Sequence, residues 1–446
     1  MRRIFWIKSV FLLFFFSLII RLFYWQVVRA EFLQSQAENQ HFTNTKIDAM
    51  RGDILFSDGF ILASSNPAFS LYGLPKVIAP DEKVKISYLL AKVLSQETGQ
   101  SYGLSESSEV DTFAKDLIAK LSQDLYWVQL KKNISTEQKK QIEDLNLPGI
   151  GFEQQSSRFY PEGSSSAHLL GFLGSDAKGA SKGYFGVEGY YDGELRGMPG
   201  LVRNENDALG LPILIGNFFE SEAKNGKNLI LNIDRSVQFI VERELKLGIE
   251  KYGAKAGSVV VMDPKTGGIL AIAAFPSYDP VKYFDYPKEY YKNPVVADQY
   301  EPGSTFKVLV MAAAINEDAV KPDTLCDSCS GPIPIGGFTI RTWNNKYYPD
   351  TSLKDVIIHS DNTGMVFTAQ KLGLDKFYSY IEKFGFGEPS DIDLQDESSP
   401  DIRSKNSWKE IDLATASFGQ GIAVTPIQMV MAVGAIANGG NLMVPH

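Results

Sequence analysis

Residues 258–275 read SVVVMDPKTGGILAIAAF, two apolar runs separated by a short polar segment. Short apolar runs bounded by turn residues predict buried strands. Pro264 follows Asp263 at the second turn position and Gly267 ends the segment, which is typical of a hairpin connection. Upstream, residues 228–233 predict another strand, and Asp234 is a candidate helix N-cap.

The residues after Asp234 predict a helix with one apolar face. Its members are Val237, Ile240, Val241, Leu245 and Leu247. A helix, a buried hairpin and then further helical segments predict an α+β or α/β domain from about residue 235 onward.

The whole chain has 446 residues, long enough for roughly two to three domains. Hydrophobic residues make up 44% and charged residues 22%, the balance of a folded globular protein. The net charge of -9 argues against a nucleic-acid partner, because phosphate binding needs an excess of basic surface.

The N-terminal segment is strongly apolar. Every residue from Val10 to Ile20 except Ser17 is apolar, and the run extends from Ile4 to Val28 if the charged side chains within it reach the membrane surface. About 20 such residues cross a bilayer. The sequence therefore predicts a transmembrane helix.

Basic residues before this run predict its orientation. Arg2, Arg3 and Lys8 favour a cytoplasmic N-terminus and an exported remainder. The alternative is a signal peptide cleaved after Ala30, against which the bulky and charged residues before Ala30 argue.

Residues 30–230, which we call the pedestal, carry no catalytic motif. Two short strands joined by Asp58-Gly59 are predicted within residues 45–62. Residues 81–147 are predicted mostly helical, with Lys131-Lys132 and Lys139-Lys140 on solvated helix faces. Glycines between 163 and 200 predict tight turns.

Ser304 and Lys307 have the spacing of a nucleophile and its base. Pro302 and Gly303 predict a loop entering a helix, on which positions i and i+3 share one face. A desolvated lysine can accept the proton of a nearby serine. Ser175 to Lys178 and Ser221 to Lys224 have the same spacing, but they lie in predicted surface loops and we interpret both as accidental.

Ser360-Asp361-Asn362 is the second candidate constellation. Its hydroxyl can relay a proton and its carboxamide can donate to a substrate carbonyl. An ordinary cap after a helix over residues 353–358 would be the better explanation of the triplet if it stood alone. Beside Ser304 and Lys307 it favours a catalytic site.

With these two motifs the chain resembles the class B penicillin-binding proteins, since S-x-x-K and S-D-N belong to the signature of penicillin-binding proteins and class A β-lactamases. Further motifs carry the resemblance along nearly the whole chain after the apolar segment. They are Arg51-Gly52-Asp53-Ile54 with Asp58-Gly59 and Leu62-Ala63, Arg158-Phe159-Tyr160-Pro161, Gly226-Lys227-Asn228, Tyr300 to Ser304, and Phe418-Gly419-Gln420-Gly421 before Thr425-Pro426. A β-lactamase fits poorly because it needs no long pedestal.

The resemblance implies an α+β fold in three parts. These are a cytoplasmic tail and transmembrane anchor at 1–29, an elongated mixed pedestal of the dimerisation type at 30–230, and a transpeptidase domain at 231–446. The last part is expected to have a central antiparallel sheet flanked by helices.

The resemblance also implies a peptidoglycan D,D-transpeptidase that penicillin inhibits covalently. Ser304 would attack a terminal D-alanyl-D-alanine, Lys307 would take its proton, Ser360 would shuttle protons, and Asn362 would bind the donor peptide. Expected partners are peptidoglycan stem peptides, β-lactams, the membrane, a membrane glycosyltransferase and division or elongation proteins, with division favoured. No cofactor and no metal are expected, and the location would be the bacterial inner membrane with the catalytic domain outside the cytoplasm.

One motif departs from the family pattern. A third motif should follow S-D-N, yet the only Lys-Thr-Gly is Lys265-Thr266-Gly267, upstream of Ser304. We interpret that triplet as the hairpin turn, with no catalytic role. The sequence up to His446 is therefore expected to be a fragment whose transpeptidase domain is incomplete, and the 446-residue product alone is expected to be inactive.

Other signals are discounted or left open. Gly179 to Gly183 matches G-x-S-x-G, but no apolar strand precedes it, and we interpret it as a loop tip. Cys326 and Cys329 could form a local disulfide or stay as two thiols, and a lone pair is only half a zinc site. The alternative function is a non-catalytic penicillin-binding scaffold or sensor.

Overall fold

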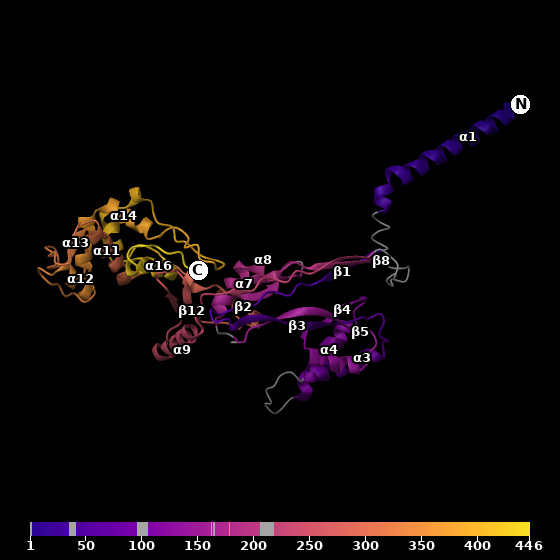
Figure 1. The fold of residues 1–446 in the computed structure, drawn as a ribbon, viewed down its shortest axis with the longest axis horizontal. Helices are drawn as coiled ribbons and strands as arrows, with labels where there is room; N and C mark the ends of the chain where they lie inside the picture. The colour runs from indigo at the N-terminus through magenta and orange to yellow at the C-terminus, as the bar shows by residue number, and fades with distance from the viewer. Residues whose placement is uncertain are drawn as a thin grey trace. The chain divides into compact units, whose positions relative to one another are not determined.

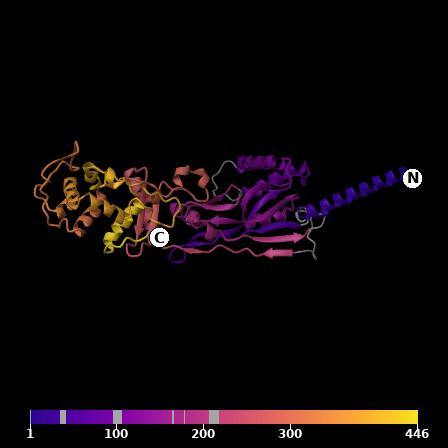
Figure 2. The same cartoon turned by 90° about the horizontal axis from the view of Figure 1, so that it is seen from above.

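The computed structural model describes residues 2–34, 42–95, 106–161, 163, 166–177, 179–205 and 218–446. The chain divides into two compact units. One unit holds residues 1–50 and 197–226, and the other holds residues 51–196 and 227–446. Figures 1 and 2 show the elements of both units from two directions.

The first unit contains the apolar N-terminal helix and a small sheet. Helix α1 (Arg2–Phe23) continues into a π-helical turn, η1 (Tyr24–Val28). Within it, the 23 residues Trp6–Val28 are long and apolar enough to cross a membrane, and none of the window is buried. The predicted apolar helix is therefore present. Strands β1 (Phe42–Ile47), β8 (Gly200–Glu205) and β9 (Phe218–Ser221) pair antiparallel in the order β1-β8-β9.

The second unit begins with a five-stranded sheet, which we call the pedestal sheet. Its strands are β2 (Ile54–Leu55), β3 (Ile61–Gly73), β4 (Val128–Ile134), β5 (Ile150–Phe159) and β10 (Leu229–Ile230). The order is β10-β2-β3-β4, and β5 also pairs with β3. As predicted, a turn through Gly59 at φ 82° joins β2 to β3.

Helices α3 (Glu82–Leu94), α4 (Glu106–Leu121) and α5 (Thr136–Asp144) pack on this sheet around a core that includes Leu90, Leu117 and Ile134. The prediction of helix across 81–147 is wrong for β4, and Lys131-Lys132 lie on that strand. Val128 and Leu130 alternate toward the core, and β4 pairs with the distant β3, which helical periodicity cannot reveal.

A buried ionic cluster, defined here as Arg51, Arg158, Glu188 and Asp192, links strand β5 to residues before β2 and after β7 (Ser181–Tyr184). Arg51 donates to Glu188 Oε2 and to Asp192 Oδ1, both at 2.7 Å, and Arg158 Nε donates to Glu188 Oε1 at 2.7 Å. The Glu188 side chain is fully buried. Two of the motifs that carry the resemblance therefore meet at one carboxylate.

Short elements follow β5: α6 (Ala167–Leu170), β6 (Phe172–Ser175), β7 (Ser181–Tyr184), α7 (Gly186–Tyr190) and α8 (Asp192–Arg196). The glycines in this segment allow tight turns and close approaches of the backbone, as predicted. Gly171 has φ 77°, and a Cβ on it would lie 2.2 Å from the Phe185 carbonyl oxygen.

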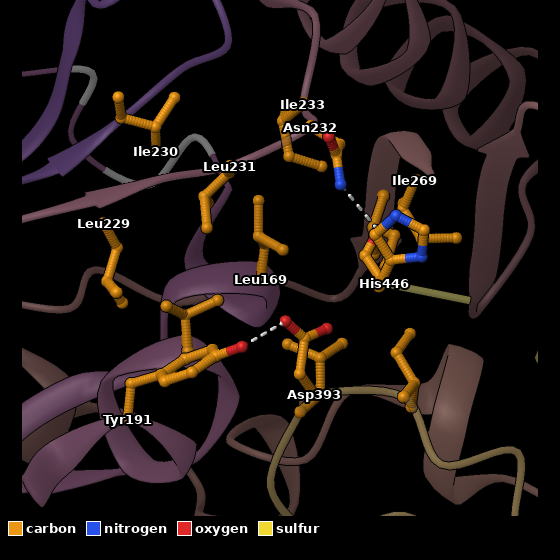
Figure 3. A pocket seen from close by; sticks show the side chains of 14 residues that line it. Leu169, Tyr191, Leu229, Ile230, Leu231, Asn232, Ile233, Ile269, Asp393 and His446 are labelled. Atoms are coloured by element: carbon orange, nitrogen blue, oxygen red, sulfur yellow. Dashed lines mark hydrogen bonds between the residues drawn. The ribbon is translucent and has the colours of Figure 1, made fainter. Parts of the chain in front are cut away.

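A second core joins these elements to the residues that follow β10. It includes Leu169, Val187, Ile269 and Ile392, which line part of an open pocket of about 90 Å³ shown in Figure 3. At one side of this pocket the Tyr191 hydroxyl donates to Asp393 Oδ2 at 2.7 Å.

Helix α9 (Arg235–Tyr252) and the hairpin of β11 (Gly257–Met262) and β12 (Ile269–Phe275) confirm three local predictions. Asp234 accepts hydrogen bonds from the backbone of Ser236 and Val237, as an N-cap does. The Gln238 side chain bonds the backbone N–H of Ile272 at 2.9 Å and its carbonyl at 2.8 Å.

Two details of this region differ from the prediction. The strand expected over 228–233 is only Leu229–Ile230, because β2, to which it pairs, has only two residues. The predicted apolar face of α9 is not fully covered, since Ile240 is 48% and Leu247 is 52% exposed.

The remaining residues form a helical region. Its bounds are α10 (Pro294–Ala297), η4 (Gly303–Phe306), α11 (Lys307–Asn316), β13 (Ile333–Ile335), β14 (Phe338–Ile340), α12 (Leu353–His359), α13 (Asn362–Leu372), α14 (Leu374–Lys383), α15 (Glu410–Ala416) and α16 (Pro426–Ala437), with short 3₁₀ turns at Tyr283–Asp285, Lys288–Tyr290 and Lys405–Ser407. Helices α11 and α13 each contribute five of the buried residues of its core.

Candidate active site

Ser304 lies in the 3₁₀ turn η4, which runs directly into α11. The Lys307 backbone N–H donates to the Ser304 carbonyl, so the two residues begin and end one 3₁₀ turn. Ser304 is exposed, whereas Phe306 beside it is 2% exposed and anchors the turn in the core. The predicted loop entering a helix is therefore present, with the hydroxyl-bearing residue at the surface.

A glycine loop supports this turn from the side. The Gly303 N–H donates to the Gly419 carbonyl at 2.9 Å, and the Gly421 N–H donates to Glu301 Oε1 at 2.8 Å. Gly419 has φ 77°, and a Cβ on it would lie 2.1 Å from the Gly303 carbonyl oxygen. Only glycine fits there. Sequence reasoning quoted residues 418–421 for the resemblance but gave them no role.

Ser360 and Asn362 lie where two helices meet. Ser360 ends α12 in the left-handed conformation, at φ 53°, and Asn362 begins α13. Asp361 between them accepts from the backbone of Thr363 and Gly364 as the N-cap of α13. The capping role considered for this triplet is thus real, but it belongs to Ser360 and Asp361 together and leaves Asn362 to project from the turn.

Lys307 brings the two motifs together. Its Nζ donates to the Ser360 carbonyl at 2.7 Å, to Ser360 Oγ at 3.1 Å and to Asn362 Oδ1 at 2.8 Å. The residue is 2% exposed. All three acceptors are neutral groups, so the lysine is buried without a direct carboxylate partner among the described residues.

This environment lowers the pKa of Lys307 from 10.5 to about 8, because burial disfavours the charged amine. The negative charge of Asp361 opposes this change and raises the pKa. An amine with a pKa near neutral pH can exist in either protonation state during a reaction, as a general base must.

The outer side of the site comes from residues 331–350. Asn362 Nδ2 donates to the Arg341 carbonyl at 2.9 Å, which fixes the orientation of the carboxamide. The Trp343 indole donates to the His359 carbonyl, and the Tyr348 and His359 rings stack with centroids 4.5 Å apart. Sequence reasoning missed this segment, because no short motif marks it.

The other candidate segments lie outside this constellation. Lys265-Thr266-Gly267 is the turn of the β11–β12 hairpin, as predicted. Ser175 and Ser221 end strands β6 and β9, so the prediction of surface loops is wrong for both, and Lys178 lies outside the described residues. Gly179 and Ala180 form the turn between β6 and β7.

Cys326 and Cys329 are joined as a disulfide, one of the two states left open by the sequence. Within the described part of the chain, no group of three or more His, Cys, Asp and Glu side chains is arranged to hold a metal ion.

Residues 257–446 match the penicillin-binding protein transpeptidase domain, and residues 46–231 match the penicillin-binding protein dimerisation domain. The chain is 35% identical to stage V sporulation protein D of Bacillus subtilis (strain 168), over 96% of this chain and 63% of that protein. It is 30% identical to the probable peptidoglycan D,D-transpeptidase PenA of Neisseria meningitidis, over 96% of this chain and 70% of that protein.

Among solved structures, penicillin-binding protein 2X of Streptococcus thermophilus superimposes with a TM-score of 0.69 at 27% identity. The match covers 91% of this chain and 60% of that chain. The present chain thus spans somewhat less than two thirds of the length of the sporulation protein and of the 2X protein.

Proposed function

This chain belongs to the class B penicillin-binding proteins, and on that premise we propose that it is a serine D,D-transpeptidase that cross-links peptidoglycan. One observation carries the proposal. A buried lysine one helical turn from an exposed serine is held by the hydroxyl and carboxamide of a second motif more than fifty positions away. That arrangement suits a serine acyl transfer better than a structural role, because a structural lysine would normally be paired with a carboxylate.

The proposed acylation uses four groups. Ser304 Oγ attacks the carbonyl carbon of a terminal D-alanyl-D-alanine while its proton passes to the neutral amine of Lys307. Ser360 Oγ, 3.1 Å from that amine, relays the proton to the leaving D-alanine nitrogen as the peptide bond breaks. Asn362, held by the Arg341 carbonyl at 2.9 Å, positions the donor peptide.

Deacylation completes the exchange. The amine of a neighbouring stem peptide attacks the ester carbonyl of the acyl-enzyme, and its proton returns through Ser360 and Lys307 to the Ser304 oxygen as the ester bond breaks. The result is a new peptide cross-link and a regenerated serine. A β-lactam would be attacked by the same hydroxyl and would remain bound as an ester.

Covalent labelling tests the assignment of Ser304. The protein expressed from its own gene is treated with a fluorescent penicillin as wild type, as Ser304→Ala and as Ser175→Ala, the control with the same S-x-x-K spacing. We expect labelling of the wild type and the control and none of Ser304→Ala, with the adduct mapped by mass spectrometry to the peptide containing Ser304. Labelling that persists in Ser304→Ala would refute the proposal, and saturable but non-covalent binding would favour the scaffold function instead.

The location is proposed from the N-terminal helix. We place the chain in the bacterial inner membrane as a single-pass protein with boundaries at 29 and 230 between anchor, pedestal and transpeptidase region. The length and apolar character of Trp6–Val28 support this placement, as do Arg2 and Arg3 before it. Mass spectrometry of the mature N-terminus is the test, and a chain that begins at Glu31 would contradict the anchor.

Partners are proposed from the family. A membrane glycosyltransferase would supply glycan strands to this enzyme, with the anchor and the pedestal as the contact surface, and the role would be at the division site rather than in wall elongation. Imaging a tagged copy of the protein checks this role. Signal spread evenly along the side wall, with none at midcell, would count against it.

A further inference from the structure

Asp361 lies between the two residues that bind the Lys307 amine, and it is 2% exposed. Its Oδ1 accepts from the Thr363 N–H at 2.7 Å, from the Thr363 hydroxyl at 2.6 Å and from the Gly364 N–H at 3.3 Å. These bonds make it the N-cap of α13. Asparagine and serine cap helices as well as aspartate does, so capping alone does not require a buried negative charge.

The second carboxylate oxygen of Asp361, Oδ2, takes no part in the helix cap. No described residue donates a hydrogen bond to Asp361 Oδ2, although the atom is buried. A buried carboxylate oxygen without a donor is costly, because water has been removed and nothing replaces it. The charge of Asp361 is therefore only partly satisfied locally, and its field extends to its surroundings.

The Lys307 amine lies within that field, because it contacts Ser360 and Asn362 on either side of Asp361. Burial lowers the pKa of Lys307, and Asp361 is the charged residue that opposes the change. The positions, the burial and the charges of Asp361 and Lys307 therefore indicate that the two residues interact electrostatically.

We propose that Asp361 is a positioning residue that acts through Lys307, stabilising the protonated amine with its buried carboxylate while its cap holds Ser360 and Asn362 against that amine. This inference rests on the proposed function, in which Lys307 receives the Ser304 proton. Asp361 itself gains and loses no proton in the reaction. Its charge makes the amine a stronger base at the moment of attack.

Other charged groups around Lys307 are exposed or distant. Glu301 before η4, Arg341 after β14 and His359 at the end of α12 are all exposed. Lys371 lies at the far end of α13, and on α14 Lys376 pairs with Glu317 at the far end of α11. Helix α16, which also packs on α11, carries no charged residue. Water and salt screen exposed charges, so the buried Asp361 dominates.

The test is a pH profile of acylation by a fluorescent penicillin, measured in the protein expressed from its own gene. Asp361→Asn keeps the size and the capping oxygen but removes the charge. Acylation should rise with pH around 8 in the wild type, where Lys307 loses its proton. In Asp361→Asn the rising limb should move by about one pH unit toward lower pH, the scale of a nearby charge on a pKa.

Two controls separate charge from structure. Asp355→Asn removes a carboxylate from α12 that accepts a hydrogen bond from the Ser352 hydroxyl at 2.6 Å, and its profile should match the wild type. Asp361→Ser, a second neutral cap, should shift the limb in the same direction and serves if the asparagine variant does not fold.

The outcomes distinguish the two levels of the proposal. A wild type that acylates while the neutral variants keep an unshifted profile overturns this inference alone. A wild type that is not acylated at any pH overturns the proposed function, and this inference with it.

Discussion

The molecule buries charge in two different ways. In the pedestal, Glu188 bonds Arg51 and Arg158 at 2.7 Å each, so every charge in the ionic cluster has an opposite partner. In the candidate active site, the hydrogen bonds of the Lys307 amine to described residues all go to neutral oxygens. Opposite partners keep a buried group charged, whereas neutral partners leave its protonation state open to change. One cluster is suited to holding a fold and the other to moving a proton.

Replacing Lys307 with methionine should have the largest effect on chemistry and little on the fold. The apolar side chain fills the same space without a desolvated amine, so thermal unfolding should occur at an equal or higher temperature than in the wild type. Acylation by a fluorescent penicillin should slow by about 10²- to 10⁴-fold, the usual contribution of a general base. A large loss of stability would show that the lysine is structural and would remove the contrast.

Glu188→Gln tests the other half of the comparison. The substitution leaves Arg51 and Arg158 buried without a full counter-charge, so the free energy of unfolding should fall by about 3–5 kcal/mol. Urea denaturation measures the change, and Glu194→Gln on the exposed side of α8 is the matched control with almost no expected loss. Equal losses in the two variants would contradict the interpretation of the cluster as a structural centre.

Two glycines with similar φ angles, one in the pedestal and one beside the candidate active site, test the comparison with smaller expected effects. Gly59 in the pedestal has φ 82° and open space around it, so Gly59→Ala should cost only about 1 kcal/mol of stability, without an effect on acylation. Gly419 has φ 77° and touches Gly303, so Gly419→Ala should displace the serine turn and slow acylation by about 10- to 100-fold. Similar acylation rates in the two variants would show that the glycine loop does not position Ser304.

The last prediction is a pH dependence of stability. The pKa of Lys307 is about 8 in the folded protein and 10.5 when the residue is free in water. Below pH 8 both states hold the proton and the folded state bears the full cost of burying it. Between these pH values only the unfolded state keeps the proton, so the cost disappears as pH rises. The melting temperature of Lys307→Met minus that of the wild type should therefore shrink from pH 8 to 10.5, and a constant difference would argue against a desolvated amine.

Local features of the fold were predictable from the sequence. The hairpin turn at 263–267, the Asp234 cap and the helical turn that carries Ser304 and Lys307 each depend on neighbouring residues alone. Strand β4 was not predictable in this way, because its pairing partner lies more than fifty residues earlier in the chain.

In the candidate site, too, local features were predictable from the sequence and contacts between distant segments were not. S-x-x-K and S-D-N were recognisable as motifs, but their meeting at the Lys307 amine depends on the packing of α11 against α13. The contact of Gly419 with Gly303 joins segments more than a hundred residues apart, and the burial of the unpaired Asp361 oxygen depends on the packing around it. No residue pattern encodes such contacts.

The Gln238 side chain bonds both backbone groups of Ile272, on the edge of strand β12. A primary amide reproduces the donor and acceptor of a peptide group, so this side chain occupies the place that a foreign strand would need in order to add to β12. Uncovered strand edges are where folded chains begin to aggregate. A single glutamine on α9 thus occupies both backbone groups of Ile272 on this edge of β12.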